Sequence, residues 1–251
     1  ARWERDEGAD IPVADHMTRL TLDTISLAGF GYRFDSFRGD TLHPFLNAMV
    51  NVLSETMVKM TRLPLVNRLA GESAGFQRDL DTMNALVDEV IRQRRAQPSG
   101  ESDLLNLMLE AVDPQTGQPL DETNIRHQVI TFLVAGHETT SGLLTFALYM
   151  LLRNPHTLAR AYAEVDRVLP GDTRPEFAHL ARLEVLERVL KETLRLWPTA
   201  PAFNVAPYED TVIGGRYAIA RDQVVSVAIP ALHRDPAVWA DPDVFDIDRF
   251  L

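Results

Sequence analysis

The sequence predicts a mainly α-helical protein with a small β-sheet late in the chain. Apolar residues recur at helical spacing over most of residues 17–196, which is typical of amphipathic helices. After Pro198 the pattern changes, and β-branched residues alternate across residues 211–230 around a Gly214-Gly215 turn, which predicts a hairpin or a small meander. We therefore expect a single domain, mainly helical over 1–200, with a small sheet and an extended segment over 201–251.

Each expected helix is bounded by residues that start or stop helices. Glycines and aromatics in GFGYRFDSF interrupt the first helix, Asp121 is a good N-cap for the longest one, and Asn154-Pro155 stops it. Trp197-Pro198 ends the last helix, and Pro201 favours an extended exit from it. The expected helices cover residues 17–27, 43–60, 73–95, 102–112, 122–153, 156–168 and 176–196.

Composition excludes several classes of function. The 251 residues carry a formal net charge of −11, so nucleic acid and anionic lipid are disfavoured as partners. The local basic cluster over 92–95 is expected to be a solvated helix end. Because the chain has no cysteine, it can form no disulfide, no thiolate zinc site and no Cys nucleophile. No targeting segment is visible, which favours the cytoplasm, and both ends read as cut from a longer protein.

The helix expected over 122–153 is long and apolar enough to raise the question of a membrane span. Some 30 residues would extend roughly 45 Å as a helix. His137 and Glu138 stand at its midpoint, however, and such side chains are costly in lipid. A central helix of a large helical core is therefore favoured.

The centre of that helix, AGHETTSG (135–142), has residues that are poor material for a packed core. Phe132, Ala135, Gly136, Thr139 and Leu143 share one helix face, and its middle has almost no side chains. A flat, wide group could lie against such a face. Close packing of a second helix also selects Ala and Gly, and is the alternative.

The polar residues of this stretch point to proton transfer. The Thr139 hydroxyl can donate to the Ala135 carbonyl and, with Gly136, loosen the helix locally. Together with the Glu138 carboxylate, these groups could hold water and relay protons. Because a carboxylate in a core is costly unless paired, a salt bridge to a neighbouring helix is the plainer explanation of Glu138. A zinc-protease motif fails, because the second His it needs is replaced by Ser141.

A second motif, KETLRLWPTAPAF (191–203), contains a Glu-x-x-Arg pair, Glu192 and Arg195. This spacing is weak evidence by itself, since it also occurs at Glu89/Arg92 and Glu164/Arg167. Apolar neighbours and the following prolines distinguish the last copy, and a buried pair there would fix architecture rather than add stability. Arg249, in DIDRF, could supply a third charged member.

Taken together in this order and spacing, AGHETT, KETLR and DIDRF resemble the cytochrome P-450 family of haem-thiolate monooxygenases. The stretches HMTRLTLDTISLAGFGYRFDSF, NIRHQVITFLVAGHETTSGLLTFALYMLLRNPH and LRLWPTAPAF are similar to the self-sufficient bacterial fatty-acid hydroxylases, whose haem domain is fused to a flavin reductase. The resemblance covers nearly all 251 residues and is most specific over 124–203. The fold it implies is the cytochrome P-450 fold.

The resemblance implies a role for each matching residue. Glu138 and Thr139 match the acid–alcohol pair that delivers protons to bound dioxygen, and Glu192 and Arg195 match a structural pair with Arg249 as partner. The residues expected to contact haem, the oxygen pocket or the substrate channel are Phe132, Ala135, Gly136, Thr139, Thr140, Thr199, Ala200 and Phe203.

Two departures from the family pattern matter. The family's proximal loop, with its axial Cys, would follow the DIDRF-like segment, yet the chain ends at Leu251 without any cysteine. The N-terminal strands are also missing, so the fold is expected to be incomplete. In addition, the family more often has Pro and Glu where Ile247 and Asp248 stand. The haem iron ligand would therefore lie outside this chain.

The expected function is that of a monooxygenase fragment, inactive alone, from an enzyme that hydroxylates an aliphatic substrate with dioxygen and NADPH-derived electrons. A fatty acid is the expected substrate, compatible with Phe132, Leu133 and Phe203. Haem b is the expected cofactor, with FAD and FMN where a reductase is fused; the partner is a flavin reductase, fused or separate. The alternatives are a haem-free helical binding protein and a non-functional relic that does not fold alone.

Overall fold

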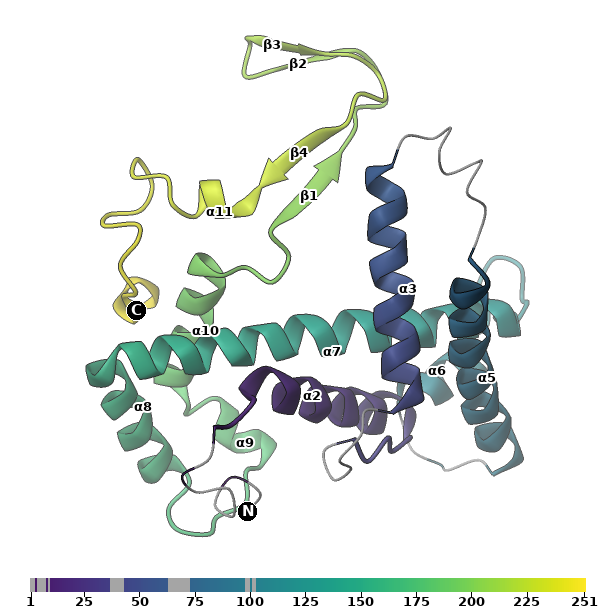
Figure 1. Cartoon of the computed structure of the whole chain (residues 1–251), viewed down its shortest axis with the longest axis horizontal. Coiled ribbons are helices and arrows are strands. Elements are labelled where there is room, and N and C mark those ends of the chain that lie inside the picture. The colour runs from purple at the N-terminus through teal and green to yellow at the C-terminus, as the bar shows by residue number, and fades with distance from the viewer. Residues whose placement is uncertain are drawn as a thin grey trace. The chain divides into compact units, whose positions relative to one another are not determined.

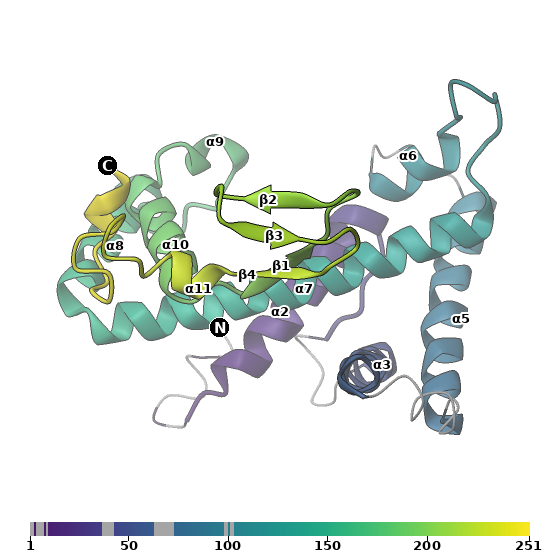
Figure 2. The ribbon, with the colours of Figure 1, turned by 90° about the horizontal axis from the view of Figure 1, so that it is seen from above.

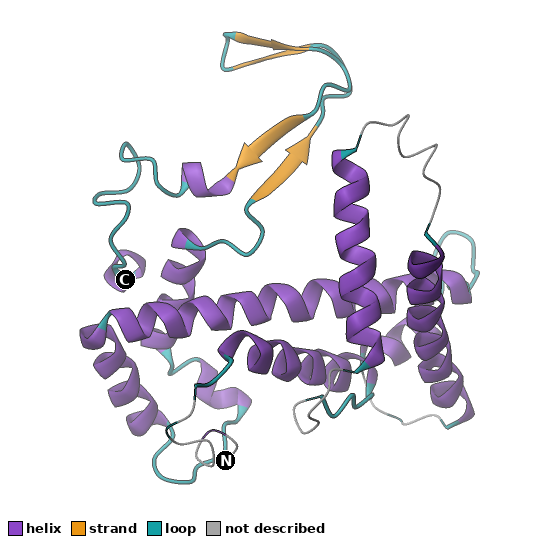
Figure 3. Cartoon of the chain, viewed as in Figure 1, coloured by secondary structure: helices purple, strands orange, loops and turns teal. Residues whose placement is uncertain are grey.

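The structure is a computed structural model, which describes residues 3, 8, 10–36, 43–62, 73–97, 100 and 103–251 (Figure 1). The chain separates into two compact units, Ala1–Ser141 and Gly142–Leu251. The boundary falls inside the longest helix, α7 (Glu122–Arg153), not at the change from helices to strands. As Figure 3 shows, all the strands that the structure describes follow the last long helix.

The helices of the first unit agree closely with the sequence prediction. They are α2 (Val13–Phe30), α3 (Pro44–Thr61), α5 (Ala74–Ala96), α6 (Leu104–Glu110) and the first part of α7. Polar side chains cap the starts of α5 and α6: Ser73 accepts from the Phe76 amide at 3.0 Å, and Asp103 accepts from the Asn106 amide at 2.9 Å. Asp121 accepts from the amide of Asn124 at 2.9 Å, as its expected N-cap role requires.

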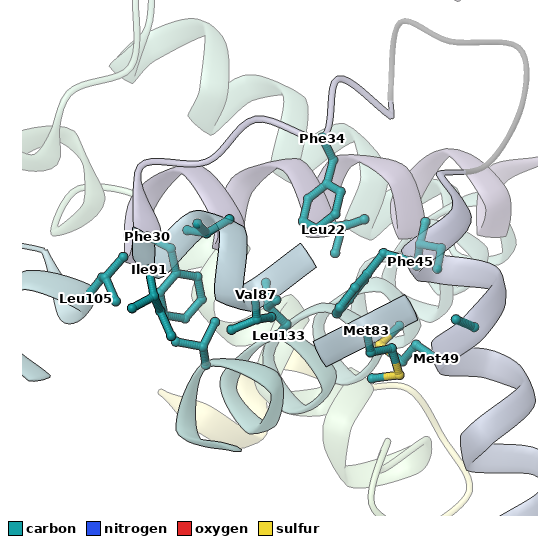
Figure 4. Close-up of a cluster of buried hydrophobic side chains, with 14 of the residues drawn as sticks. Leu22, Phe30, Phe34, Phe45, Met49, Met83, Val87, Ile91, Leu105 and Leu133 are labelled. Atoms are coloured by element: carbon teal, nitrogen blue, oxygen red, sulfur yellow. The ribbon is translucent and has the colours of Figure 1, made fainter. Parts of the chain in front are cut away.

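The core of the first unit is a cluster of aliphatic and aromatic side chains contributed by α2, α3, α5, α6 and α7 (Figure 4). Leu22 of α2, Phe45 of α3, Val87 of α5, Leu105 of α6 and Leu133 of α7 are almost completely buried in it. Their burial provides the main stabilisation of this unit, at about 1.5–3 kcal/mol for each large apolar side chain. Leu133 is thus a core residue and not, as expected, part of a substrate pocket.

A buried ion pair ties α2, α5 and α6 together. Arg94 of α5 donates to both carboxylate oxygens of Asp103 at 2.7 Å and to the carbonyl of Phe30 at 2.9 Å. Burial raises the pKa of Asp103, but its hydrogen bonds from Arg94 and from the amide of Asn106 outweigh this and hold the pKa below its usual value. The predicted solvated basic cluster is therefore wrong for Arg94.

The second unit contains α8 (Pro155–Val168), α9 (Phe177–Leu180) and α10 (Glu184–Leu196). We expected one helix over 176–196, and the structure has two. Glu176 and His179 form a capping box at the start of α9, which lasts only one turn. The carboxylate of Glu164 then accepts from the amides of Val185 and Leu186 at 2.9 and 3.0 Å, which starts α10 anew.

The strands form two separate antiparallel pairs in this unit (Figure 2). β2 (Thr211–Ile213) and β3 (Tyr217–Ile219) make the expected hairpin around Gly214-Gly215, whose φ angles of 58° and 66° suit the turn. β4 (Val225–Ala228) does not extend this hairpin into a meander. It pairs with β1 (Ala202–Val205), the extended exit that Pro201 predicted.

Short helical pieces complete the second unit. α11 (Ile229–Leu232) follows β4, and a 3₁₀ turn, η1 (Ile247–Phe250), lies in the segment expected to be extended. Ile247 is buried with Ala147, Leu151, Ala161 and Val189, so η1 belongs to the core of this unit. Among the described residues, no helix combines the length and apolar character that crossing a bilayer requires.

Replacing Gly31 with Ala is expected to destabilise the first unit. Gly31 caps α2 with a φ of 62°, and a Cβ there would lie 2.5 Å from Nη2 of Arg94. We expect the free energy of unfolding, measured with denaturant, to fall by about 2 kcal/mol or more, from left-handed strain and a displaced ion pair. Gly117→Ala, with a φ of 67° and open space around it, is the matched control and should cost about 1 kcal/mol. Equal losses in both variants would contradict the steric argument.

Candidate functional site

The face of α7 that the sequence singled out is largely open in the structure. Phe132 is 40% exposed, and the side chains of Ala135, Thr139 and Thr140 are exposed as well. Leu133 and His137, on the opposite side of the helix, are buried against the first unit's core. The face expected from the sequence is therefore divided, since Phe132, Ala135 and Thr139 are exposed whereas Gly136 packs against α2.

Gly136 has a different explanation from the expected one. A Cβ at this position would lie 3.0 Å from Cγ1 and 3.2 Å from Cδ1 of Ile25, a residue of α2. The missing side chain thus allows α2 to approach α7 closely, which is the helix-packing alternative considered for this stretch. The side chains of Ala135 and Thr139, by contrast, are exposed.

Side-chain hydroxyls bind three carbonyls around the Glu138–Thr139 pair. Thr139 Oγ1 donates to the Ala135 carbonyl at 2.6 Å, as predicted, and Ser141 Oγ donates to the Glu138 carbonyl at 2.9 Å. Thr21 of α2 donates to the His137 carbonyl at 2.9 Å, a bond that the sequence did not predict. α7 nevertheless stays α-helical from Glu122 to Arg153, so the expected loosening does not interrupt it.

Glu138 is exposed, and the expectation that it lies in a core was wrong. In the part of the chain that the structure describes, it forms no ion pair with a neighbouring helix. Its carboxylate adjoins Thr139 in sequence on the open side of α7. An exposed carboxylate beside a hydroxyl can exchange protons with water and pass them along the helix surface.

His137 is buried and serves the core. Nδ1 of its ring lies 3.1 Å from the Leu133 carbonyl, and 3% of the residue is exposed. Burial lowers the pKa of this imidazole below its ordinary value of 6.5, so the ring is neutral near pH 7. Its nitrogen therefore donates back into the helix, and His137 plays no part in the open face.

The remaining haem-contact candidates lie in the second unit between α10 and β1. Thr199 is half-buried, and a Cβ added at Gly142 would lie 3.1 Å from its Cγ2. Ala200 is exposed, and Phe203 of β1 is 51% exposed, opposite Val227 of β4. Pro198 and Pro201 flank this segment, which bends at Thr199 and Ala200 before β1 begins at Ala202.

The open face of α7 fits a haem group in its chemistry. Ala135 and Thr139 present a methyl group and a small hydroxyl side chain, which leave room for a planar macrocycle at van der Waals distance. Phe132 adds an exposed aromatic ring on the same face. The iron ligand is a separate matter, because the chain has no thiolate, and its described residues contain no cluster of three metal-ligating side chains.

The predicted Glu192–Arg195 pair is completely buried and heavily hydrogen-bonded. Arg195 donates to the two Glu192 oxygens at 2.6 and 2.7 Å and, through its remaining N–H groups, to three carbonyl oxygens. These belong to His233, Pro242 and Val244, at 2.9, 2.6 and 3.0 Å. Nε of Arg249 lies 3.4 Å from Glu192 without forming a hydrogen bond, so Arg249 is the expected third member by charge alone.

Two acidic residues with structural roles escaped the sequence analysis. Glu164, read only as part of a Glu-x-x-Arg copy, caps α10; Arg167 lies 3.9 Å away. Asp248, noted only as a departure from the family pattern, binds Arg160 through both oxygens at 2.7 and 3.0 Å and Arg188 at 3.1 Å. The hydrogen bond from Arg160 lowers the pKa of Asp248 below its usual value. No local signal reveals either role, because the partners lie 21 to 88 residues away.

Comparisons with known proteins agree with the resemblance seen in the sequence. The family model described as cytochrome P450 (here P-450) matches residues 1–251. Bifunctional cytochrome P-450/NADPH–P-450 reductase 2 of Bacillus subtilis (strain 168) is 51% identical over 253 residues, covering 99% of this chain and 24% of the relative. A self-sufficient cytochrome P-450 monooxygenase of Phanerodontia chrysosporium is 44% identical over 254 residues, covering 100% of this chain and 24% of its own.

A solved structure, the haem domain of cytochrome P-450DA, superposes with a TM-score of 0.90 at 55% identity. The superposition covers 100% of this chain and 54% of that haem domain. The chain therefore spans about a quarter of the curated relatives and about half of a complete haem domain, which confirms the expectation of a partial fold.

Removing Glu192 is expected to destabilise the second unit severely. In Glu192→Ala the guanidinium of Arg195 stays buried without its counter-ion, which costs about 3–5 kcal/mol of unfolding free energy. Glu89→Ala is the matched control, because Glu89 and Arg92 form an ion pair of the same spacing on the surface of α5. That variant should lose less than about 1 kcal/mol in the same denaturant titration. Comparable losses would show that burial does not distinguish the two pairs.

The buried His137 is expected to make stability depend on pH. Because its folded pKa is lowered, the unfolded state binds the proton first, and stability falls as the pH drops below the unfolded value of about 6.5. His137→Leu should weaken this pH dependence in unfolding titrations between pH 7 and pH 5. His127→Leu, an exposed position on the same helix, serves as control and should leave it unchanged. An unaltered slope in His137→Leu would contradict the assignment.

Proposed function

This chain belongs to the cytochrome P-450 family, and on that premise we propose that the whole protein is a haem-dependent monooxygenase. It would hydroxylate an aliphatic substrate, a fatty acid in the first place. The reaction consumes dioxygen, one NADPH, which supplies two electrons, and one proton from solvent. One oxygen atom enters a C–H bond of the substrate as a hydroxyl group, and the other leaves as water.

One observation supports this proposal above the others. The open face of α7 combines small side chains at Ala135 and Thr139 with a carboxylate at Glu138. A surface made only for helix packing would bury this face, as the Gly136 side is buried against Ile25. A binding protein without chemistry would have no use for an acid and an alcohol next to each other.

The chain's own residues would bind, orient and move protons. When bound, haem supplies the activation of dioxygen. Ala135 and Thr140 would line the distal side of the macrocycle. Thr139, whose hydroxyl is fixed at 2.6 Å from the Ala135 carbonyl, would hold a proton at its Oγ1 beside the oxygen pocket. Glu138 would replenish that proton from solvent through its exposed carboxylate.

The proposal includes an electron donor and a class of substrate. Relatives named as cytochrome P-450/NADPH–P-450 reductase proteins support a flavin reductase as electron donor, with FAD and FMN as its cofactors. The exposed rings of Phe132 and Phe203 support an apolar substrate. Haem b would take its iron ligand from outside this chain. The compartment in this proposal is the cytoplasm.

The proposal is tested by supplying the full-length protein with NADPH, isotopically labelled dioxygen and saturated fatty acids of graded chain length. We expect mass spectrometry to find hydroxylated product containing one labelled oxygen atom. A protein that binds the fatty acids but consumes no NADPH would instead be the haem-free binding protein.

Within that assay, Thr139→Val should lower the yield of product. Valine keeps the shape of threonine but cannot hold the proton, so NADPH consumption should continue while product formation falls roughly 100-fold, the scale of general acid catalysis. Thr82→Val is the matched control, since Thr82 makes the same kind of bond to a carbonyl four residues back on exposed α5. Full product yield in Thr139→Val would exclude this role for the hydroxyl.

A further inference from the structure

The carbonyl of His137 accepts a hydrogen bond from outside its own helix. Thr21 Oγ1 of α2 lies 2.9 Å from it, across 116 positions in the sequence, and both residues are buried. The amide that shares this peptide group belongs to Glu138. Thr21 therefore binds the peptide unit that leads directly into the proposed proton donor.

The peptide unit on the other side of Glu138 is held as well. Ser141 Oγ donates to the Glu138 carbonyl at 2.9 Å. Both peptide groups that flank the Glu138 Cα are thus bound by hydroxyls, one from α7 itself and one from α2. Because a side chain leaves the helix in a direction set by its backbone, fixing these groups fixes the direction of the Glu138 carboxylate.

The contact between α2 and α7 is built at two successive positions. Ile25 packs against Gly136, and one turn earlier on the same face of α2, Thr21 binds His137. The close approach permitted by Gly136 brings the Thr21 hydroxyl within reach of the carbonyl. Without it, the two helices would stand too far apart for a direct bond.

Other threonines of α2 show that this arrangement is specific. Thr18 and Thr24 donate to carbonyls four residues back, Ala14 and Leu20, at 2.9 and 2.7 Å; Thr18 is half-buried and Thr24 is exposed. The Thr21 hydroxyl lies 2.9 Å from the carbonyl four residues back, that of Met17, and 3.2 Å from the carbonyl of Thr18. Unlike the other two threonines, it also reaches a carbonyl of α7. A hydroxyl has one proton to donate, so the bond to His137 is the feature that must be tested.

We propose that Thr21 is a positioning residue for the Glu138–Thr139 pair. Its hydroxyl holds the His137 carbonyl and thereby keeps the Glu138 carboxylate aligned with the Thr139 hydroxyl. Thr21 touches neither substrate nor haem and acts through the backbone of α7. The role in the reaction rests on the proposed function, whereas the hydrogen bond can be tested without it.

Four variants of the full-length protein separate the hydroxyl from the packing of the side chain. Thr21→Val removes the hydroxyl and keeps the shape, whereas Thr21→Ala and Thr21→Ser both lose the methyl group and differ only in the hydroxyl. Thr24→Val is the control on the exposed side of α2. If Thr21→Val failed to fold, the Ala and Ser variants would still give the comparison.

Two readouts are needed. The first is hydrogen exchange of the amides of residues 138–141, which we expect to quicken about fivefold in the Val and Ala variants, the effect of one neutral hydrogen bond. The second is the yield of hydroxylated product per NADPH, which should fall several-fold with the substrate KM unchanged. Thr21→Ser and Thr24→Val should behave like the wild type in both.

The outcomes distinguish the two proposals. If the wild type hydroxylates and the Val and Ala variants match Thr24→Val in exchange or in product yield, the positioning role of Thr21 is overturned alone. Absence of hydroxylation by the wild type overturns the proposed function and the positioning role together. Faster exchange with lower yield, both restored by Ser, supports the role, because a purely structural defect would not spare KM and respond to the hydroxyl alone.

Discussion

The guanidinium of Arg195 is the point on which the second unit depends. Each of its five N–H groups has an acceptor: two on Glu192 and three on carbonyls between His233 and Val244. Glu192 also accepts from the Asp246 amide at 2.9 Å. A segment with little regular structure is thereby held against α10 by one fully bonded charge. Because such a charge tolerates no lost partner, it specifies one path for that segment rather than adding net stability.

The helices were predictable because their caps are local. The features that differ from the prediction depend on contacts between residues far apart in the sequence. Ser73, Asp103 and Asp121 cap helices through bonds to residues three positions on, so the sequence alone locates those starts. The break between α9 and α10 depends on Glu164, which lies outside both helices. The pairing of β4 with β1, instead of with the adjacent hairpin, is likewise decided by contacts that no periodicity encodes.

The candidate site shows the same division. Helical periodicity placed Phe132, Ala135 and Thr139 on one face of α7, and the bond from Thr139 to Ala135 follows from spacing alone. The environment of each residue did not follow: Glu138 is exposed, and the absence of a side chain at Gly136 serves Ile25 of α2. The three copies of Glu-x-x-Arg show most clearly that sequence spacing does not determine a residue's environment. Identical spacing gives a surface pair at Glu89, a helix cap at Glu164 and a buried network at Glu192.

The cap from Glu164 determines in which directions the side chains of α10 point. By binding the amides of Val185 and Leu186, it fixes which residue begins the helix. Every later side chain of α10 then points in a direction counted from that start, at about 100° per residue. If α10 began one residue later, Arg195 would turn away from the three carbonyls it binds and Glu192 would turn away from the Asp246 amide. The Glu164 carboxylate of α8 thus determines in which direction Glu192 and Arg195 point, two turns and more along α10.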